Sequence, residues 1–221
     1  MVYMDFSGQY EGCDGEYVDC RSIQGANCYC DDIAKEELRQ KIASFGPEGV
    51  HFFDSGNYHY VSLLWLEKVE EDFALVLFDN HPDMQPPSFG DITSCGGWVK
   101  EAIETMPHLK RVYMVGVDET LLEELEPLPS QVVRGLPQDE ALPIYISLDK
   151  DVLTEDYART DWSQGRMELS DVLEALRGLF ESYRVVGVDI CGEKKDNPSD
   201  EDLQINRQTN EALIQLLQSK G

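Results

Sequence analysis

Acidic and histidine residues cluster after two apolar runs of the sequence. Asp79, His81 and Asp83 form a D-x-H-x-D pattern directly after residues 73–78. Side chains on extended backbone alternate between two faces, so these three side chains can point the same way. Carboxylates and imidazoles bind divalent metal ions, and packing does not readily explain three such residues together. The pattern therefore predicts a metal site.

Asp149 and Asp151 form a second cluster, which follows the apolar run 143–148. Two carboxylates this close together repel each other, and this repulsion raises a carboxyl pKa. A divalent cation between them would remove the conflict. We therefore predict that Asp149 and Asp151 contribute to the same metal site.

Two further segments carry residues that suit such a site. His59 follows the stretch 54–58, in which Gly56 permits a tight turn from an apolar run into a helix. Glu193 follows the apolar run 185–190. Taken singly, His59 could also cap or pack against a helix, and Glu193 could be a surface charge beside two lysines. The hypothesis rests on the four segments together.

The rest of the chain predicts a scaffold that brings these segments together. Apolar runs alternate with amphipathic stretches, which is typical of buried parallel strands and their connecting helices. We expect strands near residues 2–6, 49–53, 74–78, 111–117, 131–133, 143–148 and 185–190. We expect helices near residues 32–45, 58–69, 97–106, 120–125, 170–182 and 206–218.

This alternation predicts a three-layer α/β sandwich with a mostly parallel central sheet, in a single domain that spans residues 1–221. Ligands bind beyond the carboxyl ends of such strands, which is where the acidic clusters lie. Residues 10–30 and 85–96 are rich in Gly, Asp, Cys, Pro and Ser and interrupt the alternation. We expect them to be long loops that are functional or mobile.

Composition narrows the class of protein. The 221 residues include 18 Lys and Arg against 43 Asp and Glu, and the net charge of −25 argues against a nucleic-acid partner, whose phosphates attract basic surfaces. Hydrophobic residues make up 42% of the chain, enough for a folded core. Neither a membrane-spanning run nor a signal peptide is evident, so we expect a cytoplasmic protein with no membrane partner. The spacing of Cys13, Cys20, Cys28 and Cys30 lacks the paired knuckles of a zinc site, which favours buried or free thiols.

The motifs resemble those of the ureohydrolases, the family of arginase, agmatinase and formiminoglutamase. That family carries G-G-D-H, D-A-H-x-D and S-x-D-x-D in this order, and the corresponding stretches here are residues 56–59, 79–83 and 147–151. The resemblance extends from about residue 49 to 195. The chain is shorter than typical members, so it resembles a short, divergent member of the family with an arginase-like fold.

The resemblance implies a hydrolase that cleaves a C–N bond of a guanidino or amidino group with a hydroxide held between two Mn²⁺ ions, releasing urea from a guanidine. It assigns one ion to His59, Asp79, Asp83 and Asp149, and the other to His81, Asp79, Asp149 and Asp151. Mostly oxygen ligands with two imidazoles suit Mn²⁺. Asp83 would also orient the hydroxide and pass its proton to the leaving amine. Members of the family are often homo-oligomers, so a homo-oligomer is an expectation here.

The substrate-binding part of the family pattern differs in this chain. The family's D-x-x-E acid corresponds to Glu193, one residue later than usual, which the resemblance assigns to gripping the guanidinium. Gln85 and Ser94 correspond to substrate-binding positions, and Trp98 or Gly97 replaces the family's proton-shuttling histidine. Trp98 is expected to line an open mouth. A small amine such as agmatine, or arginine within a peptide, is therefore favoured over free arginine.

Other functions remain open from the sequence. A non-catalytic regulatory protein could keep the metals and the fold without turnover. A related metal-dependent amidohydrolase or deacetylase would use a pair of histidines as acid and base, for which no pair is evident among the four histidines. A two-metal phosphoesterase would carry a G-N-H-[DE] stretch, which the sequence lacks.

Overall fold

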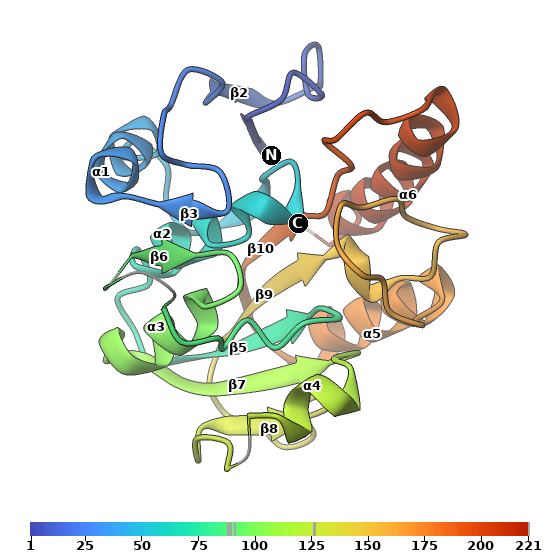
Figure 1. Cartoon of the computed structure of the whole chain (residues 1–221). Helices are drawn as coiled ribbons and strands as arrows, with labels where there is room; N and C mark the ends of the chain where they lie inside the picture. Colours follow the sequence, from blue (N-terminus) through green and yellow to red (C-terminus); the bar gives the residue numbers. More distant parts are fainter. Residues whose placement is uncertain (88–89, 91, 126, 221) are drawn as a thin grey trace.

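The computed structural model describes residues 1–87, 90, 92–125 and 127–220. Eight strands form a sheet in the order β2-β1-β4-β10-β9-β5-β7-β8, and the neighbouring strands pair in parallel (Figure 1). Their bounds are β1 (Val2–Asp5), β2 (Glu16–Asp19), β4 (Gly49–Phe52), β5 (Phe73–Phe78), β7 (Leu109–Val115), β8 (Val132–Arg134), β9 (Ile144–Asp149) and β10 (Val185–Cys191). The predicted parallel sheet is confirmed.

Helices cover both faces of this sheet. They are α1 (Asp32–Lys41), α2 (Val61–Leu66), α3 (Trp98–Thr105), α4 (Glu119–Glu123), α5 (Leu169–Ser182) and α6 (Asp200–Gln218), with the 3-10 turns η1 (Gly56–Tyr58) and η2 (Lys150–Val152). In Figure 1, α1, α2 and α3 lie on the opposite side of the central strands from α5 and α6. The last helix begins earlier than the predicted residue 206 because Ser199 and Asp202 form a capping box around its first turn.

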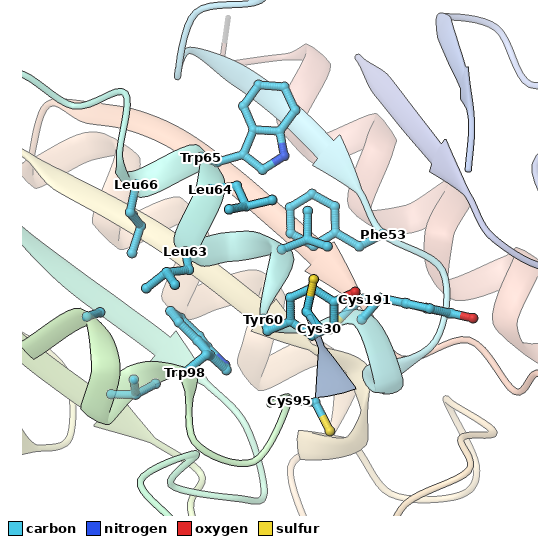
Figure 2. Packing of buried hydrophobic residues seen from close by; sticks show 14 of the residues in the cluster. Cys30, Phe53, Tyr60, Leu63, Leu64, Trp65, Leu66, Cys95, Trp98 and Cys191 are labelled. Carbon is cyan, nitrogen blue, oxygen red and sulfur yellow. The ribbon is translucent and has the colours of Figure 1, made fainter. Parts of the chain in front are cut away.

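The alternation of side chains along β5 explains the three layers. Leu75 and Leu77 belong to the apolar cluster that contains helices α1, α2 and α3, whereas Val76 and Phe78 belong to the cluster that contains α5 and α6. A strand with apolar residues on both faces must be covered on both, so a continuous apolar run produces a buried central strand. Figure 2 shows the first cluster, where Trp65 and Trp98 pack beside the leucines of α2.

Two predicted loops contain short strands. β2 and β3 (Tyr29–Cys30) lie within residues 10–30, and β6 (Thr93–Ser94) lies within 85–96; residues 88, 89 and 91 of that stretch are outside the described part. β2 pairs with β1, and β3 pairs with β6 as a separate antiparallel ladder. These strands have only two to four residues and little apolar periodicity, so tertiary pairing rather than sequence pattern defines them.

The central strands β10, β9 and β5 are neighbours in the sheet. Because they run parallel, the residues that follow them emerge at one edge. This arrangement places the segments after Phe78, Leu148 and Ile190 side by side. Among the described residues, no helix is long and apolar enough to cross a membrane.

Candidate metal centre

Two groups of metal-ligand side chains meet at this edge of the sheet and share Asp79. One group is His59, Asp79 and Asp83, and the other is Asp79, His81 and Asp151; the ligand atoms within each group lie within 4.8 Å of one another. The Nδ1 atom of His59 lies 3.2 Å from Asp79 Oδ2, 3.0 Å from Asp83 Oδ2 and 3.6 Å from Asp149 Oδ2. The Nδ1 atom of His81 lies 2.8 Å from Asp151 Oδ2. The structure thus brings all six predicted ligands together.

Each imidazole is oriented by a hydroxyl group on its other nitrogen. His59 Nε2 lies 2.9 Å from Ser147 Oγ, which in turn lies 3.0 Å from Ser62 Oγ. His81 Nε2 lies 2.8 Å from Ser163 Oγ. These contacts leave the Nδ1 atom of each ring facing the carboxylates, as expected for a histidine that binds a metal through Nδ1.

The carboxylates are buried, and their environment changes their pKa values. Asp79, Asp83, Asp149 and Asp151 are only 1–6% exposed. Burial and the charge of Asp79 raise the pKa of Asp151 to about 7. Burial would lower the pKa of His81, but hydrogen bonds to Asp151 and Asp79 outweigh this effect and raise it to about 11. Hydrogen bonds to Asp79 and Asp83 likewise overcome burial and raise the pKa of His59.

The donor set fits divalent cations. Asp79 Oδ2 is buried and lies 3.2 Å from His59 Nδ1, but it accepts no well-aligned hydrogen bond among the described residues. A buried carboxylate oxygen without a well-aligned hydrogen bond costs free energy, and a cation at this point would compensate for it. Four buried carboxylates also carry a charge that two divalent cations would balance.

A cavity of about 360 Å³ opens over this centre. Besides the ligands, its lining includes two predicted substrate-binding residues, Gln85 and Ser94. It also includes residues that the sequence analysis did not assign to the site, namely Cys28, Cys95 and Trp162. Trp162 is 41% exposed, and its indole N–H donates to Asn57 Oδ1 at 2.9 Å. Trp162 lies outside the helices and strands, so no periodic sequence pattern indicated that it would line the cavity.

The sequence was compared with known protein families and with characterised and uncharacterised proteins. No family model matches the sequence. The chain is 32% identical over 203 residues to a protein of Thermotoga maritima described as an uncharacterized protein, and the match covers 86% of this chain and 78% of that one. The chain belongs to the same family as this Thermotoga protein.

Solved structures identify the fold. Formimidoylglutamase from Bacillus subtilis superposes with a TM-score of 0.66 at 15% identity, covering 94% of this chain and 71% of that one. Arginase from Bacillus subtilis superposes with a TM-score of 0.61 at 14% identity, covering 84% and 78%. The chain has the arginase fold. At these identities the likeness shows the fold alone.

Trp98 occupies a different place in this arginase fold from the predicted one. Its indole is fully buried and lies outside the residues that line the cavity. Instead of facing a substrate, the indole N–H donates to Asp83 Oδ2 at 2.6 Å. The reason is that α3 packs this side chain against α2, so only its polar edge reaches the metal centre. Trp98 is thus a positioning residue for Asp83.

Glu193 also lies elsewhere than predicted. It is buried, and its carboxylate accepts hydrogen bonds from Lys150 Nζ at 2.6 Å and Asn210 Nδ2 at 2.7 Å. Lys150 stands between Asp149 and Asp151, and its side chain is fully buried on the side away from them. Glu193 lines a second cavity and not the one over the metal centre. The Glu193 carboxylate therefore points toward Lys150 and not into the cavity over the metal centre.

Cys191 is a neighbour of the metal centre that the sequence analysis did not assign. Its thiol donates to Asp149 Oδ2 at 3.2 Å and forms a third ligand-type group with His59 and Asp149. The sequence feature that could have indicated Cys191 is its position at the end of the apolar strand β10, which neighbours the ligand-bearing strand β9. A single cysteine in an apolar run looks like a core residue, which is why the pattern did not reveal it.

Proposed function

We propose that this chain is a hydrolase that uses two Mn²⁺ ions to cleave the C–N bond of a guanidino or amidino group. The supporting observation is that two ligand groups share Asp79 and open into one cavity. His59, Asp79, Asp83 and Asp149 would hold one ion, and His81, Asp79, Asp149 and Asp151 the other. Solved structures with this fold include an arginase, a formimidoylglutamase and a proclavaminate amidino hydrolase.

The protein's own residues provide binding, orientation and proton transfer. When bound, two Mn²⁺ ions would lower the pKa of a water molecule and polarise the substrate's amidino group. Asp83 would accept the proton of that water and pass it to the leaving amine, because its Oδ2 lies at the cavity beside His59 Nδ1. The hydrogen bond from Trp98 would hold Asp83 in this orientation.

We propose that the substrate is a cation with an apolar stem, such as agmatine or an arginine side chain in a peptide. The exposed Trp162 indole offers a ring face to a guanidinium at the cavity, and Gln85 and Ser94 offer polar contacts. The net charge of −25 would attract such a cation over long distances. Asp83, Gln85 and Ser94 remain our proposed catalytic and substrate-binding residues.

The proposal is tested with a panel of guanidino and amidino compounds and Mn²⁺-loaded protein. Guanidines are assayed for urea, and formimino compounds are assayed for formamide or ammonia. We expect at least one compound to be hydrolysed, and we expect Asp83→Asn to lose most of that activity while it still binds metal. An Asp83→Asn protein with both ions and full activity would exclude this proton path.

Trp98 and Glu193 do not line the cavity over the metal centre, and this favours a second candidate function, a metal-binding regulatory protein without turnover. Two positions assigned to substrate handling by the family resemblance instead serve internal packing and an internal ion pair. Failure of the whole panel, with two ions confirmed by metal analysis, would support this second candidate.

A further inference from the structure

Cys28 and Cys95 face each other on the wall of the metal cavity. The β3–β6 ladder pairs Tyr29 with Ser94, and the N–H of Cys95 donates to the carbonyl oxygen of Cys28 at 2.8 Å. Cys28 therefore adjoins Cys95 just beyond the end of this ladder, and the two side chains interact. A disulfide needs Cα atoms roughly 4.4–6.8 Å apart, a separation that a direct backbone hydrogen bond between the two residues favours.

The two thiols have complementary chemistry. Both are free cysteines. The hydrogen bond from Cys95 lowers the pKa of Cys28 to about 7 in spite of partial burial, and the Lys195 ammonium adds to the effect. The bond to Cys28, together with burial, raises the pKa of Cys95. Cys28 is therefore available as the thiolate that attacks an oxidant, with Cys95 beside it as the resolving thiol.

The remaining cysteines lack this combination. Cys20 and Cys30 are buried away from the cavity, and burial raises their pKa values to about 12 and about 11. Burial also raises the pKa of Cys191, which lies beside Asp149. In Figure 2, the sulfur atoms of Cys30 and Cys95 point in opposite directions. Cys13 is exposed, but burial of its sulfur and the charge of Asp5 raise its pKa. Cys28 therefore combines a lowered thiol pKa with a neighbouring thiol, that of Cys95.

We propose that Cys28 and Cys95 form a redox site at which a peroxide produces a reversible disulfide. The Cys28 thiolate attacks the O–O bond of hydrogen peroxide, giving a sulfenic acid and hydroxide. The Cys95 sulfur then attacks the sulfenic sulfur, forming the S–S bond and releasing water. Two thiols are oxidised and one peroxide is reduced to two waters, and a dithiol reverses the reaction.

The disulfide would lock the wall of the metal cavity. The Cys28 N–H donates to the carbonyl oxygen of Asn57, two residues before His59, at 3.2 Å. The Gln85 N–H, two residues after Asp83, donates to the carbonyl oxygen of Gly96 at 2.9 Å. A bond between Cys28 and Cys95 thus links the segment that carries His59 to the segment that follows Asp83. This site does not depend on catalytic turnover.

The test treats the reduced, full-length protein with equimolar hydrogen peroxide. We expect the loss of two of the six thiols, a mass loss of two hydrogen atoms, and one cross-linked peptide pair that contains Cys28 and Cys95. Dithiothreitol should restore both thiols. In Cys95→Ser we expect dimedone to trap a sulfenic acid at Cys28.

Cys13→Ser is the matched control, since it removes an exposed thiol and should leave the cross-link intact. The wild-type peptide map decides the matter even if a variant fails to fold. Cross-links through other cysteines, or oxidation of Cys28 to a sulfinic acid without any cross-link, would overturn the proposal.

Discussion

At the scale of single residues, two serine hydroxyl groups connect the histidines to the rest of the protein. Ser147 contacts His59 and Ser163 contacts His81, in each case at the nitrogen that faces away from the carboxylates. Such contacts decide which ring nitrogen is free to bind a metal. Neither serine would be a metal ligand itself, but both should influence metal affinity.

We therefore predict that Ser147→Ala weakens metal binding by about 10- to 100-fold, the range found when a residue that orients a metal ligand is removed. Affinity is measured by competition with a chelator of known strength. The control is Ser170→Ala, which removes an exposed hydroxyl at the start of α5. Equal affinities for the two variants would show that Ser147 does not orient His59.

The carboxylates should differ in their effects on metal content. Asp151 belongs to one ligand group, whereas Asp79 belongs to two. We predict that Asp151→Asn retains one ion per chain and that Asp79→Asn loses both, as measured by elemental analysis after gel filtration. Asp72→Asn, at the surface beside His108 and Lys110, should keep the wild-type content. One ion in the wild-type protein would contradict the shared role of Asp79.

At the scale of elements, the D-K-D segment at the end of β9 has two sides. Asp149 and Asp151 face the metal centre, while Lys150 is buried against Glu193 and Asn210 of α6. The alternation of side chains thus places ligands on one side and an internal ion pair on the other. This ion pair attaches the ligand-bearing segment to β10 and α6.

We predict that Glu193→Gln lowers the free energy of unfolding by about 3–5 kcal/mol, because it leaves the buried ammonium of Lys150 without its charge partner. The double variant Lys150→Met with Glu193→Gln should lose less, since no unpaired charge is buried. Urea unfolding of the single and double variants measures the coupling. Additive losses would show that the two residues stabilise the fold independently.

At the scale of the whole molecule, the buried carboxylates and histidines of the candidate metal centre make stability depend on pH. The folded chain without metal holds His81 with a pKa of about 11, raised from 6.5, and Asp151 with a pKa of about 7, raised from 3.8. In both cases the folded state binds the proton more tightly than the unfolded state. The stability that these protons contribute is lost as pH rises from about 4 to 7 for Asp151 and from 6.5 to 11 for His81.

We therefore predict that the melting temperature of the chelator-treated protein falls between pH 6 and pH 9. Metal affinity should rise over the same range, because metal ions compete with these protons. Scanning calorimetry with and without Mn²⁺, in buffer with added salt to screen the surface charges, measures both effects. A chelated protein whose melting temperature is independent of pH would contradict the protonation of this centre.

The sequence by itself determined the parallel sheet and the candidate ligands that the structure brings together. Continuous apolar runs such as residues 73–78 are typical of central strands, and acids spaced by two residues after such parallel strands emerge at one edge. Both properties are local, because they depend on the type and spacing of neighbouring residues.

Only the tertiary structure decided the surroundings of the ligands. It turned Trp98 toward Asp83 and Glu193 toward Lys150, and it placed Cys28 opposite Cys95. These contacts join residues that are distant in the sequence, and short strands such as β3 and β6 have no periodic pattern. Their pairing follows from the packing of the whole chain.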